Sequence, residues 1–348
     1  MNKFMAPLIL TVIVSLAIAF PGAAQALGDK ELLESAKEYF EPLPGKPEFK
    51  RDNPGSKAKI ELGKALYFEK RLSSSNVFSC NSCHDLALGG ADNSSFSIGH
   101  KWKKGGRNAP TVFNASLHLA QFWDGRAKDV EHQAGMPVLN PVEMNATEEM
   151  VLERLGSIPE YVKMFANAFP GEKPSLTYKN VAKAIGAFER TLLTPSRFDQ
   201  FLAGKLDAMT KGEKEGLKLF IDTNCVICHN GATVGGLAYQ KFGVFKKPDF
   251  LTDNGRFDVT KDKNDMYVFK VPSLRNIELT YPYFNNGAVW DLKEAVKIMA
   301  DVQLGEQLSD QDAGKIVVFL KSLTGDKPKI ELPTLPPATV STSRPDTD

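Results

Sequence analysis

The chain has 348 residues, 42% of them hydrophobic, and its 43 lysines and arginines nearly balance its 42 aspartates and glutamates. This length is enough for two domains with cores of their own. The balanced charge, with no basic patch interleaved with aromatic residues, excludes nucleic acid as the expected partner. Partner proteins would meet local charged patches instead of one strong field.

The first segment, 1–26, has the pattern of a secretory signal peptide. Lys3 precedes an apolar run at 8–20, and small residues follow up to Ala26, after which cleavage is expected. A membrane anchor is the alternative, but it needs about 20 uninterrupted apolar residues, and Pro21 ends this run early. The mature chain is therefore predicted to lie in the periplasm without a membrane span.

A helix is predicted over 57–71, where apolar residues recur at helical spacing, and it leads into Cys80-Asn-Ser-Cys83-His84. Two thiols three positions apart can each add to a vinyl group of one porphyrin, while the adjacent imidazole binds the iron. This pattern predicts a covalently bound haem c. Cys80 and Cys83 are its expected attachment points, and His84 is an expected iron ligand.

A glycine- and serine-rich stretch, 89–99, follows this motif and ends at His100. Such a loop is able to move and release a ligand, so His100 is the most suggestive second ligand for the first iron. A histidine pair gives a lower reduction potential than histidine with methionine. His118 and His132 are the other candidates, and composition alone does not choose among the three.

The second half repeats the motif. A helix is predicted over 211–221, with Thr210 as its N-cap and Glu213 in a capping box. It leads into Cys225-Val-Ile-Cys228-His229, which predicts a second covalent haem attached at Cys225 and Cys228 with His229 as an iron ligand.

Two methionines are candidates for the remaining position on the second iron. Met266 lies in a polar loop, and Met299 ends a helix predicted over 291–300. Helical spacing also makes Met299 compatible with plain core packing. The residues alone leave this choice open.

The cysteines have two alternative interpretations. Paired cysteines form zinc sites, but those usually hold their pairs about 15 to 20 residues apart, and here the pairs lie much further apart. A thioredoxin-like dithiol needs only the two cysteines. It leaves the histidine after each pair without a role, so two haems are the better interpretation.

A further echo links the two halves. Residues 187–194 align with 318–325, and Phe188 and Leu192 are expected one helical turn apart, as are their counterparts. Unrelated amphipathic helices are the alternative for this echo alone. Together with the repeated motif, it indicates a duplicated cytochrome c unit.

The predicted fold class is mainly α, with two cytochrome c-like haem domains in tandem and long loop insertions. The boundary between them is expected where Pro195 interrupts helix. The tail is rich in proline, serine and threonine, and its last dozen residues are expected to be disordered. The predicted segments are the signal peptide 1–26, the first domain 27–195, the second domain 196–330 and the tail 331–348.

From about residue 30 to 325, the chain resembles the bacterial di-haem cytochrome c peroxidases. The resemblance rests on blocks in the family's order. They are CNSCH at 80, SIGHKW at 97, RNAPTVFNA at 107, QFWDGRA at 121, QAGMPVLNPVEM at 133, NCVICH at 224, VPSLRN at 271 and LTYPYF at 279.

The resemblance implies roles for the iron ligands. His84 and His100 would hold a low-potential peroxidatic haem, with His100 displaceable. His229 and Met299 would hold a high-potential haem that receives electrons. Trp123 would lie between the haems on the electron path, although a tryptophan in an apolar stretch is also compatible with simple core packing.

The resemblance also implies a distal pocket and a calcium ion. Glu143 would be the catalytic acid-base, with Gln133 beside it; an ordinary solvated carboxylate is the alternative for Glu143. Asn108 through its side chain, with Thr280 and Pro282 through backbone carbonyls, would bind calcium, and waters would complete its six to eight ligands. At the first position of the pair Asn285-Asn286, many members of that family have histidine.

The implied activity is reduction of hydrogen peroxide to water, with electrons from a small c-type cytochrome or a cupredoxin. Reduction of the high-potential haem would release His100, and a homodimer is the family's usual form. A di-haem electron carrier without peroxidase activity is the alternative. A third candidate is an oxidase that modifies tryptophans of a partner protein, but those relatives have tyrosine where this chain is expected to use Met299.

Overall fold

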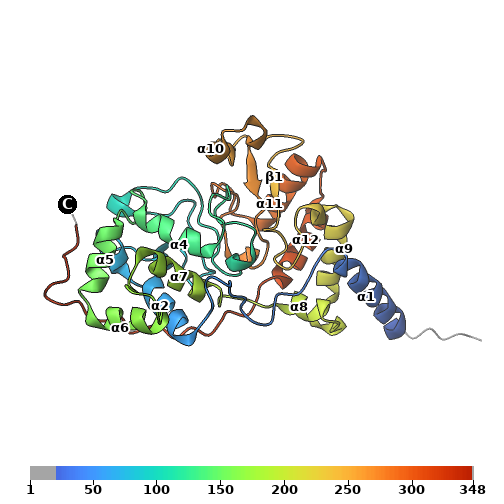
Figure 1. The fold of residues 1–348 in the computed structure, drawn as a ribbon. Coiled ribbons are helices and arrows are strands. Elements are labelled where there is room, and N and C mark those ends of the chain that lie inside the picture. The colour runs from blue at the N-terminus through green and yellow to red at the C-terminus, as the bar shows by residue number, and fades with distance from the viewer. Residues whose placement is uncertain (1–20, 347–348) are drawn as a thin grey trace, which may run out of the picture.

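A computed structural model describes residues 21–346, with side chains from residue 28 onward, and shows two helical lobes side by side (Figure 1). Most of the predicted signal peptide, 1–26, lies outside the described residues. Long loops join short helices, and a single two-stranded antiparallel sheet pairs Tyr239 with Lys270 among the described residues. The predicted mainly α fold class is confirmed.

The helices divide between the lobes. The described part of the chain begins with α1 (Pro21–Lys37), and the first lobe contains α2 (Lys57–Tyr67), α3 (Cys80–Cys83), α4 (Val130–Leu139), α5 (Glu148–Gly156), α6 (Pro159–Ala168) and α7 (Tyr178–Glu189). The second lobe contains α8 (Arg197–Leu202), α9 (Lys211–Asp222), β1 (Tyr239–Lys241), α10 (Phe257–Thr260), β2 (Val268–Lys270), α11 (Leu292–Met299) and α12 (Asp310–Ser322). Within residues 21–346, no helix combines the length and apolar character that a membrane crossing requires.

Both lobes are built on the same helix crossing. In the first, α2 packs against α7, and a Cβ on Gly63 would overlap the carbonyl oxygen of Ala184. In the second, α9 packs against α12, and a Cβ on Gly216 would overlap the carbonyl oxygen of Lys315. The matching glycines let the two backbones touch. This equivalence supports the predicted duplication.

Replacing Gly216 with alanine is expected to lower the stability of the haem-loaded protein by about 1–3 kcal/mol, because the added methyl forces α9 away from α12. Gly212 lies on the same helix, where a Cβ would meet only Val318 Cγ1 at 3.6 Å. Gly212→Ala is therefore the matched control. Thermal unfolding checks both variants, and equal melting temperatures would contradict the crossing's importance.

The local helix signals are mostly confirmed. The α9 helix begins after Thr210, whose side chain forms the predicted capping box with Glu213. The terminal helix α7 ends at Glu189, so Leu192 lies beyond the helix and the predicted one-turn spacing from Phe188 is wrong there. Leu192 is nevertheless fully buried in the first core.

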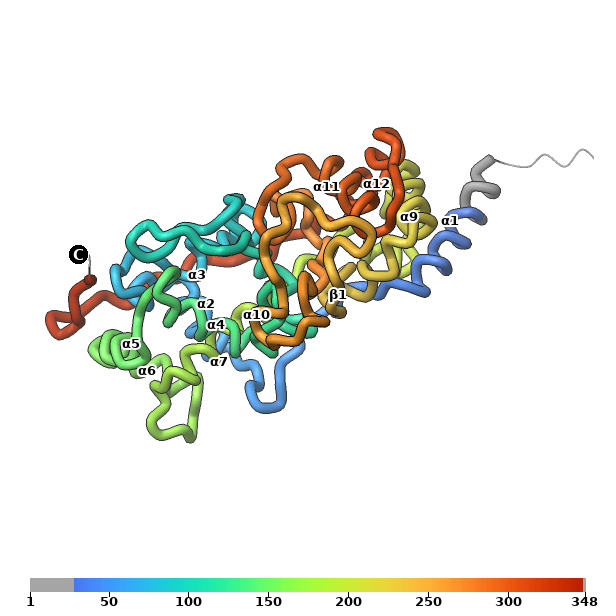
Figure 2. The backbone as a smooth tube through the Cα atoms, turned by 90° about the horizontal axis from the view of Figure 1, so that it is seen from above, coloured from blue at the N-terminus to red at the C-terminus, as the bar shows by residue number. Residues whose placement is uncertain are grey.

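The first described helix, α1, packs on the second lobe. The α1 helix precedes the first lobe in sequence, but Leu33 and Ala36 from α1 and Phe40 just beyond it belong to the core of the second lobe, with Phe198 and Phe319. Both views show α1 beside α9 (Figures 1 and 2). The start of the predicted first domain, 27–195, thus packs in the core of the second lobe.

The tail returns to the first lobe, where the C-terminus lies near α5 (Figure 1). The fully buried guanidinium of Arg154 donates from Nε to Ser343 Oγ at 3.2 Å and from Nη2 to the carbonyl oxygen of Arg344 at 3.2 Å. The amide of Asp346 donates to the carbonyl oxygen of Ser74 at 2.9 Å. The expected disorder of the last dozen residues is thus wrong as far as Asp346, because a buried cation binds this segment.

Candidate functional site

The first cysteine motif forms the short helix α3, which follows Ser79. The Ser79 amide donates to Ser82 Oγ at 3.0 Å, which holds the helix start. His84 Nδ1 lies 3.0 Å from the carbonyl oxygen of Pro110. Since a carbonyl only accepts, Nδ1 carries the hydrogen, and Nε2 keeps a lone pair for a metal. Tyr67 Oη donates to the carbonyl oxygen of His84 at 2.6 Å.

The surroundings of this motif are apolar but contain carboxyl groups. Burial lowers the pKa of His84. Burial also raises the pKa of the Cys83 thiol to about 11, against a hydrogen bond with Ser97. Glu143 contributes to the raised pKa of both Cys80 and Cys83. The charge of Glu143 therefore acts on both thiols of the motif.

The loop ending at His100 is held against Glu143. The His100 amide donates to the carbonyl oxygen of Glu143 at 2.8 Å, and His100 Nδ1 lies 3.1 Å from Ser74 Oγ. A Cβ on Gly99 would overlap the carbonyl oxygen of Val142. His100 is only 3% exposed. The structure thus brings His100 and Glu143 together.

Residues after His100 have strained backbone. Lys101 and Trp102 have φ angles of 53° and 60°, the left-handed region that side chains with a Cβ rarely adopt. The Trp102 side chain is 77% exposed, so its ring offers little burial in compensation. The loop carrying His100 is therefore fastened at one end and strained at the other.

The carboxyl group of Glu143 is partly sheltered. Asn140 Nδ2 donates to Glu143 Oε1 at 2.7 Å. Burial raises the pKa of Glu143, while the Asn140 amide and the charge of Arg126 act in the opposite direction. Gln133 lies on α4, whose last turn precedes the Asn140 loop. A carboxyl group with a raised pKa suits proton transfer near neutral pH.

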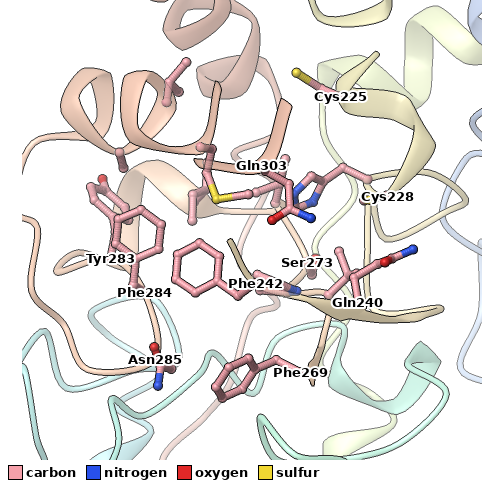
Figure 3. Close-up of a pocket in the computed structure, with 18 of the residues that line it drawn as sticks. Cys225, Cys228, Gln240, Phe242, Phe269, Ser273, Tyr283, Phe284, Asn285 and Gln303 are labelled. Carbon is pink, nitrogen blue, oxygen red and sulfur yellow. The ribbon is translucent and has the colours of Figure 1, made fainter. Parts of the chain in front are cut away.

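The second motif borders a large, mainly apolar cavity. Cys225, Cys228 and His229 line it together with Met299. Figure 3 shows Cys225 and Cys228 on one side of this cavity, with Phe242 and Phe284 across it. Burial lowers the pKa of His229 to about 4, so the imidazole is neutral, the form that binds metals.

The methionine candidates separate in the structure. Met299 ends α11 and lines the cavity, whereas Met266 follows a 3₁₀ turn at Lys263–Asp265 outside the cavity lining. The chain continues from Met299 into a π-helical turn, Ala300–Leu304. Such turns often mark functional sites because they re-aim side chains. Gln303 in this turn accepts the Gly243 amide at 3.0 Å.

Trp123 lies where the lobes meet. Its indole Nε1 donates to the carbonyl oxygen of Asn108 at 2.9 Å, and its own carbonyl oxygen accepts the Lys270 amide at 2.8 Å. Trp123 also lines the cavity beside the second motif. The first lobe's loop thus contributes a large aromatic ring to the second lobe's cavity.

The residues expected to bind calcium all line this cavity. Asn108 Nδ2 donates to the carbonyl oxygen of Ser94 at 2.8 Å, and this hydrogen bond does not use Oδ1. Asn93 Nδ2 donates to the carbonyl oxygens of Leu279 and Tyr281. Within the described residues, the carbonyl oxygens of Thr280 and Pro282 accept no hydrogen bond.

The adjacent side chains of Asn285 and Asn286 have different partners. Asn285 is buried, and its Nδ2 donates to Asp253 Oδ2 at 3.0 Å. Asn285 Oδ1 is buried without a hydrogen-bond partner in the described structure. Asn286 Nδ2 donates to the carbonyl oxygen of Phe250 at 3.0 Å. Neither side chain makes a hydrogen bond to His229 or Met299.

The structure also places the two remaining candidate histidines, together with Lys270 and Ser74, which the sequence interpretation did not single out. His132 is exposed on α4, whereas His118 and Lys270 line the cavity of the second motif. The signal for Lys270 was present, since it is a lone charge in the apolar run Tyr267-Val-Phe-Lys-Val271. Ser74, the partner of His100, carried no comparable signal.

Comparison with known proteins agrees with this arrangement. The family described as di-haem cytochrome c peroxidase matches residues 57–207, and the cytochrome c family matches residues 213–324. The chain is 50% identical over 319 residues to a cytochrome c551 peroxidase of Pseudomonas aeruginosa, covering 90% of this chain and 92% of that one. The chain belongs to the di-haem cytochrome c peroxidase family. It therefore carries two haem c groups.

Other relatives show the breadth of this family. A cytochrome c551 peroxidase of Nitrosomonas europaea is 48% identical, covering 89% of this chain and 91% of that one. The methylamine utilization protein MauG of Methylorubrum extorquens is 32% identical, covering 90% and 92%. Among solved structures, a MauG-like protein associated with microbial copper homeostasis has a TM-score of 0.73 at 29% identity, covering 82% of this chain and 95% of that one.

Proposed function

We propose that this chain reduces hydrogen peroxide to two waters in the periplasm, with electrons delivered singly by a small c-type cytochrome or a cupredoxin. The observation that carries the proposal is the partly sheltered carboxyl group of Glu143, whose pKa burial raises, beside the loop of His100. An electron carrier with two closed haems has no use for such a group. The test is peroxide-dependent oxidation of a reduced small cytochrome by the purified protein.

The residues present fit two haem c groups. Cys80 and Cys83 would attach the first haem, with His84 and His100 as its iron ligands. The tautomer that Pro110 selects for His84 supports this assignment.

The second haem would be attached at Cys225 and Cys228, with His229 and Met299 as its iron ligands. The large apolar cavity that all four residues line supports this assignment. Methionine opposite histidine raises the reduction potential, so this haem is the expected receiver of electrons.

The haems supply the redox chemistry, and the surrounding residues move the protons. Glu143 takes a proton from one oxygen of hydrogen peroxide and returns it to the departing oxygen, so that water leaves instead of hydroxide. The Asn140 amide orients this carboxyl group. Gln133 orients the peroxide and stabilises the developing charge by hydrogen bonding.

His100 would act as a switch. With both haems oxidised, His100 would block access to the first haem, and the loop would release His100 once the second haem is reduced. The strained φ angles of Lys101 and Trp102 lower the energy needed to leave this conformation. The hydrogen bonds from His100 to Glu143 and Ser74 oppose release, so the loop has two competing states.

Trp123 would carry electrons between the haems. Its ring lines the second cavity while its indole N–H is fixed on Asn108 of the first lobe. A fixed aromatic ring at the junction shortens the gap that an electron must cross.

A homodimer is also expected from the family, and sedimentation velocity on the purified protein checks it.

A calcium ion would be bound by Asn108 Oδ1 and by the carbonyl oxygens of Thr280 and Pro282. These are hard oxygen donors, and waters would complete the coordination shell. Asn108→Leu is expected to lower the calcium content of the dialysed protein from about one ion per chain to near zero. Elemental analysis with haem as the internal standard measures this, and an unchanged calcium content would exclude the site.

A further inference from the structure

Lys270 is a buried cation without an anionic partner. It lies on β2 and is 7% exposed. Among the described residues, no ion pair includes Lys270, and the only side chain that forms a hydrogen bond with its ammonium is His118, with Nζ 3.3 Å from Nδ1. Burial lowers the pKa of Lys270 to about 8. A buried charge normally requires an opposite charge or several hydrogen bonds, so this site lacks a component.

His118 adds a second donor that lacks an acceptor. Because the ammonium of Lys270 only donates, Nδ1 of His118 accepts, and the hydrogen of the neutral ring lies on Nε2. That Nε2 is buried and has no hydrogen-bond partner in the described structure. A Cβ on Gly236 would lie 2.5 Å from His118 Cδ2, so the backbone there packs on the ring and fixes its direction.

Both donors line the cavity that contains the second cysteine motif. The Lys270 amide is tied to the carbonyl oxygen of Trp123, and Phe269 and Val271 beside it are buried. The rest of the lining is largely apolar. The missing partner is therefore an acceptor that enters with the occupant of this cavity, and haem c carries two propionate groups.

We propose that Lys270 and His118 form the binding site for a propionate of the second haem. The ammonium forms a charge-assisted hydrogen bond with one carboxylate oxygen, and the imidazole Nε2–H donates to the same carboxylate. The proposal rests on the second haem occupying this cavity. It does not depend on peroxide turnover, because a simple electron carrier would use the same site.

The pair also has a consequence for electron transfer. A fixed positive charge beside a haem disfavours the ferric state, which carries the additional positive charge. Lys270 thus raises the reduction potential of the second haem. It acts as a positioning residue for the haem and assists the role expected from methionine ligation.

The test is a spectroelectrochemical titration of the haem-loaded Lys270→Met variant. At a fixed applied potential, the ratio of oxidised to reduced second haem is expected to rise about tenfold, equivalent to about 59 mV for a one-electron couple. Lys263→Met is the matched control, because Lys263 is exposed in the same lobe, outside the cavity lining, and its loss removes the same charge. This control should shift the ratio much less.

Resonance Raman spectroscopy supplies a second readout, independent of potential. The propionate bending band of the second haem should shift in Lys270→Met and in His118→Leu, and should be largely restored in Lys270→Arg. If Lys270→Met does not retain haem, His118→Leu is titrated in its place. An unchanged band with an unchanged potential, or an equal shift in Lys263→Met, would overturn the proposal.

Discussion

Replacing Glu143 with glutamine is expected to lower peroxide turnover by a factor of about 10² to 10⁴, the range that a positioned acid-base group contributes. Glutamine keeps the shape of the side chain and can still contact Asn140, but it does not take up or return a proton. The haem absorption spectra should therefore stay unchanged while turnover falls. Steady-state oxidation of a reduced small cytochrome measures the effect.

The matched control for this prediction is Glu148→Gln. Glu148 lies in the first turn of α5 and is exposed, so its carboxylate is solvated. Its replacement should leave turnover within about twofold, because an exposed charge contributes little to a buried reaction site. Near-normal turnover in Glu143→Gln would mean that another group transfers the proton, and the mechanism proposed above would fail.

Replacing His100 with glycine is expected to give peroxidase activity without prior reduction of the second haem. The change removes the imidazole that is proposed to block the first haem, together with its contact with Ser74. Glycine also removes a side chain from the strained loop. Fully oxidised His100→Gly should react with peroxide from the first turnover, whereas the oxidised wild type should not.

Stopped-flow mixing with peroxide checks this expectation before and after ascorbate treatment. His132→Gln serves as the control, since His132 is exposed on α4. That variant should keep the wild-type requirement for reduction. If His100→Gly still needs reduction, some other element closes the first haem and the loop is not the switch.

Much of this arrangement could be predicted from the sequence because the signals are local. The capping box of Thr210 and Glu213 predicts the start of α9, and the structure has both hydrogen bonds. The haem motifs are equally local, since covalent attachment requires adjacent residues. The close crossing at Gly63 and Gly216 was not predicted, because a glycine in a helix does not reveal which backbone approaches it.

Long-range packing explains the differences. Leu33 and Phe40 have the same apolar character whichever core they join, so the sequence does not indicate that they pack with the second lobe. The tail lies on the first lobe because Arg154 is buried beneath it and binds its carbonyl oxygen at Arg344. Composition predicts disorder for such a tail, since it contains few apolar residues.

The environment of the candidate site was likewise only partly predictable. Resemblance pointed to Glu143 and His100, but their contact through the His100 amide depends on how two loops meet. Lys270 stands out in the sequence as a lone charge in an apolar run, but only the structure shows its burial and its contact with His118. Burial is a property of the whole fold, and it converts an ordinary charge into a group that requires a partner.

The most direct test of the central claim is electron paramagnetic resonance of the purified protein, fully oxidised and then half-reduced with ascorbate, with peroxide turnover assayed in both states. A switched peroxidase should lose the histidine-methionine signal on half-reduction, show a changed signal from the first haem, and turn over peroxide only then. Two unchanging low-spin haems without turnover in either state would contradict this account and make the protein an electron carrier.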